Sequence, residues 1–221
     1  MTDTYGTRVA ALKAGIADRL PAEVLTAFTE EQEKLLAADL AANAAPVGTP
    51  LPHADLLDAH GNPTTLADAL GGRPAVLVFY RGAWCPYCNL ALRTYQEQLV
   101  PALAERGIGF VAISPQKPDG SLSITETNAL TFTVLADAGN TVASALGILS
   151  PDRDQLVREA ALALGVDVAA TNGDGTDRVP MPTTIVADAD GRITWIDVHP
   201  DYTERTEPEA ILAALDQHTA P

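Results

Sequence analysis

Cysteine, basic residues and long apolar runs are all scarce in this sequence, and each scarcity excludes a class of protein. Only two cysteines occur in 221 residues, so the chain is not a small secreted domain held together by disulfides. The 14 basic residues are outnumbered by 29 acidic ones, for a net charge of −15, which argues against binding to nucleic-acid phosphates or an anionic membrane. No uninterrupted aliphatic or aromatic run is longer than six residues, the length of the run at 75–80, which is too short to span a bilayer.

The N-terminus also lacks the basic start and apolar stretch of a secretory signal peptide. We therefore expect a cytoplasmic protein. The apolar content of 47% and the charged content of 19% are typical of a globular chain, and the length suits one domain with an appendage. We thus expect a folded globular protein without a nucleic-acid or membrane partner.

Residues 1–45 show helical periodicity and no strand signal. One apolar stripe ends near Leu20, and Pro21 suits the start of a second helix. A second apolar stripe at 24–40 has charged residues on its opposite side. We predict a helical hairpin that extends a domain at 46–221. Its simplest role is packing or dimerisation without chemistry of its own, so a homodimer is one expectation.

From residue 51 onward, strand and helix signals alternate. Apolar runs at 75–80 and 108–113 predict buried strands, and an amphipathic helix at about 86–105 joins them. A further strand pair at 183–198 is predicted as a hairpin. We predict an α/β fold with a central mixed sheet, mostly parallel, flanked by helices.

An insertion at about 150–178 interrupts this alternation. It begins with a helical pattern and ends in a polar loop at 172–177. The loop resembles a calcium-binding loop in its alternating oxygen side chains, but it lacks the distal glutamate that such a loop requires. Turn chemistry explains the loop better, and we expect no metal there.

The two cysteines occur together in the run Trp84-Cys85-Pro86-Tyr87-Cys88, between a predicted strand and a predicted helix. Pro86 suits the first helical position, which places Cys85 at the helix N-terminus, where the dipole favours a thiolate. Cys88 follows one turn later, close enough to close a disulfide with Cys85. A structural zinc site needs two further ligands, and the histidines are distant and unpaired. Redox chemistry is the better interpretation.

A second feature is Met181-Pro182 at the entrance to a predicted strand. Proline is tolerated at the first residue of a strand. A cis bond before Pro182 would present a free backbone edge beside the cysteines for an extended substrate. A trans proline would merely mark the strand start, and the sequence leaves both options open.

The span from about 48 to 218 resembles the thioredoxin superfamily, and it looks most like the peroxiredoxin-like branch of the alkyl hydroperoxide reductase / thiol-specific antioxidant (AhpC/TSA) family. The run 79–89, Phe-Tyr-Arg-Gly-Ala-Trp-Cys-Pro-Tyr-Cys-Asn, carries most of this resemblance. Supporting motifs stand at 112–116, 182–186, 190–191 and 201–208. The resemblance implies a thioredoxin-like fold, Cys85 as the attacking thiol, Cys88 as the resolving thiol, a hydroperoxide substrate, a thioredoxin-type reductant and no cofactor.

The sequence departs from the family pattern in three places. Typical members carry Thr or Ser three residues before the attacking cysteine and Pro seven before it. Counted from Cys85, those positions hold Gly82 and Val78. Typical members also carry an Arg at the start of the strand that here begins at Thr183, and Pro182 occupies about that position in this sequence. Arg81 or Arg178 could substitute for that charge, although a surface position suits Arg178 better.

Three functions therefore remain open. The first is a peroxidase that forms a sulfenic acid and then an internal disulfide. The second is a thioredoxin- or glutaredoxin-like protein disulfide oxidoreductase, which the Cys-Pro-Tyr-Cys motif resembles. The third is a non-enzymatic subunit that binds a partner or a metal.

Overall fold

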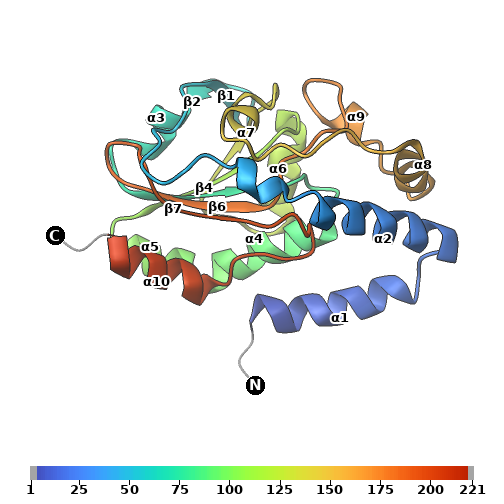
Figure 1. The fold of residues 1–221 in the computed structure, drawn as a ribbon. Coiled ribbons are helices and arrows are strands. Elements are labelled where there is room, and N and C mark those ends of the chain that lie inside the picture. The colour runs from blue at the N-terminus through green and yellow to red at the C-terminus, as the bar shows by residue number, and fades with distance from the viewer. Residues whose placement is uncertain (1–3, 219–221) are drawn as a thin grey trace.

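A seven-stranded mixed sheet forms the centre of the molecule (Figure 1). The computed structural model describes residues 4–218, so the first three residues of the predicted extension and the last three of the predicted domain lie outside it. The strand order is β2-β1-β5-β4-β3-β6-β7. The strands are β1 (Asp55–Asp58), β2 (Pro63–Thr65), β3 (Ala75–Phe79), β4 (Gly109–Ser114), β5 (Thr133–Ala136), β6 (Thr183–Ala187) and β7 (Ile193–Val198).

Only the centre of this sheet is parallel. β3 pairs with β4 and β4 with β5 in parallel, while the other four neighbouring pairs are antiparallel. The predicted α/β class and central mixed sheet are confirmed, but the expectation of a mostly parallel sheet is wrong. Short turns join β1 to β2 and β6 to β7, and such turns produce antiparallel neighbours. β6 also pairs with β3 in the antiparallel direction, with Leu77 opposite Ile185.

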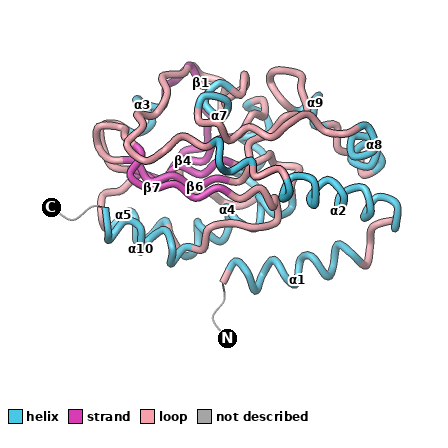
Figure 2. Tube along the Cα trace, viewed as in Figure 1, coloured by secondary structure: helices cyan, strands magenta, loops and turns pink. Residues whose placement is uncertain are grey.

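Helices cover both faces of the sheet, as Figure 2 shows in cyan around the magenta strands. One face packs against α4 (Pro86–Gln98), α5 (Val100–Glu105), α6 (Pro118–Thr127) and α10 (Pro208–His218). The other packs against α3 (Leu66–Leu70) and α7 (Thr141–Ala145). The helix predicted at 86–105 is therefore two helices, because Pro101 lacks the N–H that would continue α4.

Strand β3 lies between β4 and β6 in the sheet and is buried on both faces of that sheet. Val76 and Val78 point into the core on the α4 side, whereas Leu77 and Phe79 point into the core on the α3 side. This alternation follows from the two-residue period of a strand. The continuous apolar run at 75–80 is thus confirmed as a strand buried on both faces, and it leads directly into the cysteine pair.

The N-terminal helices α1 (Tyr5–Ala17) and α2 (Ala22–Ala37) form the predicted hairpin, drawn in blue in Figure 1. α1 packs against α4, and the Tyr5 side chain belongs to the same core as the cysteines. The Tyr5 hydroxyl donates to the Thr203 carbonyl at 2.8 Å. The Glu207 carboxylate accepts from the N–H groups of Tyr5 and Gly6 at 2.9 and 2.7 Å. The hairpin is therefore built into the region around the cysteines.

The segment at 150–178 contains α8 (Gln155–Ala163), which packs against α2, and α9 (Val168–Thr171). In its polar loop, the Asn172 amide donates to the carbonyls of Thr176 and Arg178, at 2.9 and 3.0 Å. Asp177 pairs with Arg158 at 2.5 Å. These contacts are turn chemistry. Across residues 4–218, no three His, Cys, Asp or Glu side chains gather as metal ligands, and no helix there is both long and apolar enough to cross a membrane.

Candidate active site

The cysteine pair lies where β3 ends and α4 begins. Cys85 is the N-cap residue of α4 and Pro86 occupies the first turn, as predicted. The Cys85 N–H donates to the Gly82 carbonyl, and the Cys88 N–H donates to the Cys85 carbonyl, both at 3.1 Å. Both thiols are free and buried, with exposed fractions of 1% for Cys85 and 0% for Cys88. A helix turn thus brings the two sulfur atoms together inside the protein.

The loop before Cys85 requires a glycine. Gly82 has a φ of +151°, and a Cβ atom there would lie 2.5 Å from the Trp84 indole nitrogen. The Asn89 amide then holds the loop from the helix side, donating to the carbonyls of Ala83 at 2.7 Å and Cys85 at 3.0 Å. Gly82 therefore serves the packing of Trp84 against the site, which a larger residue would prevent.

A buried arginine that sequence reasoning missed contacts Cys88. Arg205 Nη2 lies 3.0 Å from Cys88 Sγ, although 117 positions separate the two residues. Its Nη1 donates to the carbonyls of Tyr202 at 2.8 Å and Glu204 at 2.5 Å. The side chain is buried. The available signal was the motif at 201–208, which carries this cation.

The surroundings of the two thiols shift their pKa values in opposite directions. Burial is the main reason that the pKa of Cys85 is well above its usual value, and the hydrogen bond with Cys88 adds to this rise. Burial also opposes ionisation of Cys88, but the hydrogen bond from Cys85 and the charge of Arg205 outweigh it and lower the Cys88 pKa. The expectation of a lowered pKa at Cys85 is therefore wrong. The helix N-terminus favours a thiolate there, but burial and the neighbouring sulfur outweigh it.

Arg81, which the sequence singled out, reaches the site. Its guanidinium carbon lies 4.2 Å from the centre of the Tyr202 ring and 5.1 Å from that of Trp84. Its charge lowers the pKa of both thiols, and its backbone hydrogen-bonds Cys88. Among residues 4–218, no carboxylate forms an ion pair with Arg81. Aromatic faces therefore hold this buried cation in place of an ion pair.

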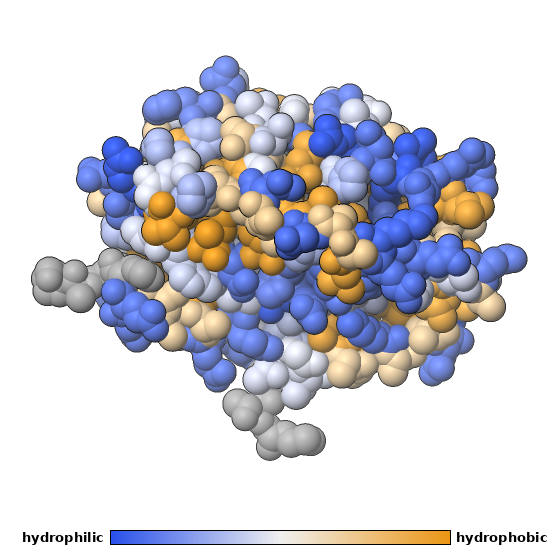
Figure 3. All heavy atoms as spheres, viewed as in Figure 1, coloured by the Kyte–Doolittle hydropathy of each residue, from blue (hydrophilic) through white to orange (hydrophobic). Residues whose placement is uncertain are grey.

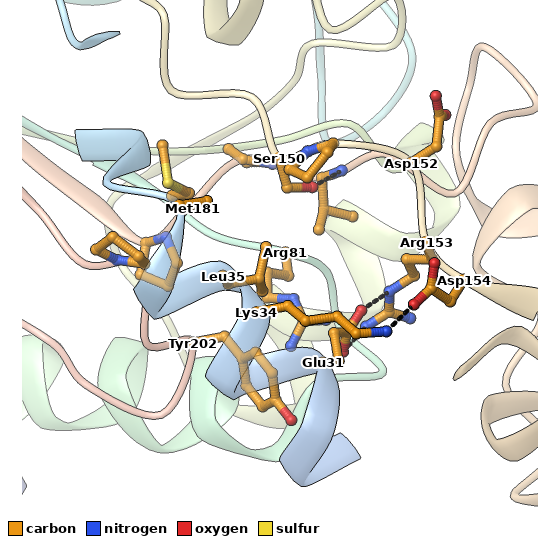
Figure 4. Close-up of a pocket in the computed structure, with 16 residues that line it drawn as sticks. Glu31, Lys34, Leu35, Arg81, Ser150, Asp152, Arg153, Asp154, Met181 and Tyr202 are labelled. Carbon is orange, nitrogen blue, oxygen red and sulfur yellow. Dashed lines mark hydrogen bonds and ion pairs between the residues drawn. The ribbon is translucent and has the colours of Figure 1, made fainter. Parts of the chain in front are cut away.

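A second missed arginine connects the N-terminal hairpin to the site. Arg153 Nε lies 3.0 Å from Glu31 Oε1 of α2, and both side chains are buried. The guanidinium carbon of Arg153 is 5.8 Å from the centre of the Trp84 ring. Figure 4 shows this ion pair beside Arg81 and Tyr202 at the wall of a cavity of about 260 Å³. The buried pair thus holds α2 against the loop that carries Arg153.

Met181 and Pro182 line this cavity together with Arg81, so the structure brings them close to the site. The bond between them is trans. The Met181 N–H donates to the Ile148 carbonyl at 2.8 Å, and the Pro182 carbonyl accepts from the His199 N–H at 2.9 Å. The backbone edge that a cis bond was expected to offer to a substrate is thus already paired within the protein.

The remaining candidates divide between the site and the scaffold. Trp84 and Tyr87 line a cavity next to Cys85, and the Tyr87 ring lies 6.2 Å from that of Tyr202. Arg178 is half-buried, and its Nε donates to the Ser150 carbonyl at 3.2 Å. Within residues 4–218, no hydrogen bond or ion pair joins Arg178 to the cysteines, and its contact with Ser150 is structural.

Comparison with known proteins places these features in a family context. The AhpC/TSA family profile matches residues 47–196. A protein of Mycobacterium tuberculosis assigned to the peroxiredoxins is 33% identical over 100 residues. That alignment covers 45% of this chain and 62% of the relative, so the chain spans less than two thirds of the relative's length.

Solved structures share the fold. The peroxidoxin BcpB of Mycobacterium tuberculosis superposes with a TM-score of 0.58 and 22% identity, over 77% of this chain and 96% of that one. Reduced Prx3 of Vibrio vulnificus, crystallised with hydrogen peroxide, gives a TM-score of 0.61 and 23% identity, over 77% and 99% of the two chains. At these identities the likeness establishes the thioredoxin-like fold.

Proposed function

Because this chain belongs to the AhpC/TSA family, we propose that it is a thiol peroxidase in which Cys88 attacks the hydroperoxide and Cys85 resolves. The contact of 3.0 Å between Arg205 and Cys88 carries this proposal. A thiolate is the reactive form of cysteine, and Arg205 favours it at Cys88. The sequence interpretation assigned the two roles in the opposite order, and that assignment remains a prediction until the variants below are measured.

The two cysteines supply both electrons needed to reduce one hydroperoxide. The Cys88 thiolate attacks one peroxide oxygen, the O–O bond breaks, and the other oxygen leaves as an alkoxide that takes a proton to become an alcohol. Cys88 is then a sulfenic acid. Cys85 then attacks that sulfur and gives up its thiol proton, and the displaced hydroxide takes up a proton and leaves as water. A dithiol of the thioredoxin type would restore both thiols by disulfide exchange.

The family pattern supports this order of events. Typical members carry a hydroxyl residue three positions before the attacking cysteine and Pro seven before it. Counted from Cys88, those positions hold Cys85 and Arg81. Cys85 supplies the hydrogen bond to Cys88 that a hydroxyl would make, and Arg81 adds a charge. One side chain, Cys85, can thus serve as polar partner first and as resolving thiol later.

Protein disulfide exchange is the second candidate, and the motif Cys-Pro-Tyr-Cys favours it. Exchange with an extended substrate would use a free backbone edge beside the cysteines. The pairing of Met181 with Ile148 occupies that edge, so peroxidase chemistry has the better support. Four statements stay predictions from the sequence: the thioredoxin-type reductant, the cytoplasmic location, the homodimer, and the third function, in which the chain is a subunit that binds a partner or a metal.

A single-turnover experiment tests the order of attack. Reduced Cys85→Ser should consume one equivalent of peroxide rapidly and leave Cys88 as a sulfenic acid, which dimedone traps for mass spectrometry. Reduced Cys88→Ser should lose the rapid phase. The reverse pattern would assign the attack to Cys85. If the wild-type protein has no rapid phase and only reduces insulin disulfides, the peroxidase proposal fails.

A further inference from the structure

Neither cysteine can be reached by another protein in this structure. The exposed fractions of Cys85 and Cys88 are 1% and 0%. Cys85 borders a cavity of about 440 Å³, and α1 and α2 supply much of the outer wall of that cavity. Both helices precede the segment at 47–196 that matches the family. Because a disulfide is reduced only when a thiolate reaches one of its sulfur atoms, a protein reductant needs the N-terminal hairpin to move.

The hairpin is packed less deeply than the helix that carries Cys88. Of the 13 residues of α1, only Tyr5 and Val9 are buried. Of the 16 residues of α2, only Val24 and Glu31 are buried. By contrast, α4 has 13 residues and buries five of them. Figure 3 shows apolar side chains between the hydrophilic surfaces of α1 and α2. Elements with few buried apolar contacts open at the lowest cost in free energy, so the hairpin is the part of the cover that opens most easily.

A short segment at 202–207, which we call the connector, holds both helices of the hairpin. The Tyr202 hydroxyl donates to the Phe28 carbonyl of α2 at 3.3 Å. The Thr203 carbonyl and the Glu207 carboxylate accept hydrogen bonds from the first two residues of α1. A shift of the connector would therefore loosen α1 and α2 together.

The connector also carries the cation that contacts the cysteine pair. Arg205 Nη2 lies 3.0 Å from Cys88 Sγ. Its Nη1 donates to two carbonyl groups of the connector itself, those of Tyr202 and Glu204. The guanidinium is thus tied to the connector on one side and to the sulfur on the other, so a change at the sulfur acts on the segment that holds the hairpin.

Oxidation changes the charge balance around this buried guanidinium. No carboxylate within residues 4–218 forms an ion pair with Arg205, and its Nε has no hydrogen-bond partner there. A disulfide between Cys85 and Cys88 carries no charge, so its formation removes the thiolate beside the guanidinium. A buried cation that loses its anion destabilises the state that buries it, and exposure to water relieves that cost.

We propose that the N-terminal hairpin is a redox-sensitive lid, closed over the cysteines when Cys88 is a thiolate and released when the pair becomes a disulfide. This inference rests on the proposed function, in which a hydroperoxide supplies the oxidation. Once the thiolate is lost, Arg205 moves toward water and the connector moves with it. The connector then loses its contacts with α1 and α2, and Cys85 becomes accessible to a protein dithiol.

Reduction closes the lid again. A thiolate of the protein dithiol attacks Cys85 Sγ, which borders the cavity under the hairpin. The S–S bond breaks, and Cys88 leaves as a thiolate beside Arg205. The second thiol of the reductant gives up its proton and attacks its partner sulfur, and Cys85 leaves and takes up a proton. Two electrons thus pass from the dithiol to the cysteine pair, and the anion that favours the closed state is restored.

Hydrogen exchange with mass spectrometry tests the lid without using peroxide. Diamide converts the reduced protein to the disulfide form, which mass spectrometry confirms. In the disulfide form, the amides of α1 should exchange faster by about tenfold or more. The helix α6 is the internal control, because no hydrogen bond or ion pair joins it to the connector in the described part of the chain, and its exchange should stay unchanged. Equal exchange of α1 in the two forms would overturn the inference.

Two serine variants separate the loss of charge from the formation of a disulfide. Reduced Cys88→Ser lacks the anion and forms no disulfide, so α1 should exchange as fast as in the oxidised wild-type protein. Reduced Cys85→Ser keeps the thiol beside Arg205 and a polar partner for it, so α1 should exchange slowly. Slow exchange in both variants would show that the charge of Cys88 does not hold the lid, and the inference would fail.

The outcome also distinguishes the lid from the peroxidase proposal. If diamide releases α1 but a hydroperoxide forms no disulfide, the peroxidase proposal fails and the coupling between the pair and the hairpin stands. If a hydroperoxide forms the disulfide and the exchange of α1 does not change, the peroxidase proposal stands and the lid is refuted.

Discussion

The two sides of the cysteine pair are built on opposite principles. Behind Cys88 the protein is closed and polar, and Arg205 is held there by two carbonyl groups and directed at the sulfur. In front of Cys85 the protein is open and apolar, with a cavity walled by α1 and α2. The comparison teaches that the two thiols lie in different surroundings, because a buried cation contacts Cys88 while an apolar cavity borders Cys85.

Removing the charge of Arg205 behind Cys88 should have the largest effect on the Cys88 pKa and on the peroxide rate. Arg205 lowers the Cys88 pKa, so Arg205→Met should raise it. For each unit by which that pKa exceeds the working pH, the thiolate fraction falls about tenfold. The peroxide rate at neutral pH should fall accordingly and recover as the pH is raised. Thiolate absorbance titration and stopped-flow kinetics measure both changes.

A surface arginine supplies the control for that experiment. Arg106 pairs with Asp216 at 2.6 Å on the exposed side of the molecule. Arg106→Met should leave the titration and the rate unchanged, since a surface pair contributes little. If Arg205→Met also leaves the Cys88 titration unchanged while the protein stays folded, Arg205 has a structural role only.

Arg81 lies at the boundary between the two sides, and Arg81→Met should have an intermediate effect. Its charge lowers the pKa of both thiols, but it follows Arg205 among the influences on Cys88. The Cys88 pKa should therefore rise less than in Arg205→Met, and the peroxide rate should fall with it. The loss of two ring contacts should cost about 0.5–2 kcal/mol in the free energy of unfolding, measured with urea. A normal titration with a reduced rate would show that Arg81 acts on the peroxide alone.

The fold was largely predictable from the sequence because its signals are local. The run at 75–80, the helix start at Pro86 and the hairpin at 183–198 each depend on neighbouring residues. The direction of β6 relative to β3 was not predictable in this way. Strand pairing depends on where the chain travels between distant segments, and the sequence at 146–182 carries no local signal for that path.

The candidate site likewise contains residues that local sequence predicted and residues that it could not predict. Cys85, Cys88 and Arg81 are close in sequence, and their spacing alone predicted a shared site. Arg205 contacts Cys88 across 117 positions, and Tyr5 contacts Thr203 across 198. Such contacts form only when α1 and the loop before α10 pack against α4, so spacing could not reveal them. The lowered pKa of Cys88 follows from its hydrogen bond with Cys85, which spacing could suggest, and from the charge of Arg205, which spacing could not.

The smallest expected effect concerns how α1 supports the closed side. Tyr5 donates to the Thr203 carbonyl at 2.8 Å, two residues before Arg205. Tyr5→Phe keeps the ring in the core and removes one buried hydrogen bond, which should lower the free energy of unfolding by about 0.5–1.5 kcal/mol. The Cys88 titration should barely move, because the two carbonyl contacts of Arg205 remain.

Tyr87→Phe is the matched control for Tyr5→Phe, since the Tyr87 hydroxyl makes no hydrogen bond to the described part of the chain. It should leave the urea midpoint unchanged. A large rise in the Cys88 pKa in Tyr5→Phe would show that one hydroxyl of the N-terminal hairpin holds Arg205 in place. The hairpin would then set the ionisation behind Cys88 as well as the cavity in front of Cys85, and the two sides of the pair would depend on one element.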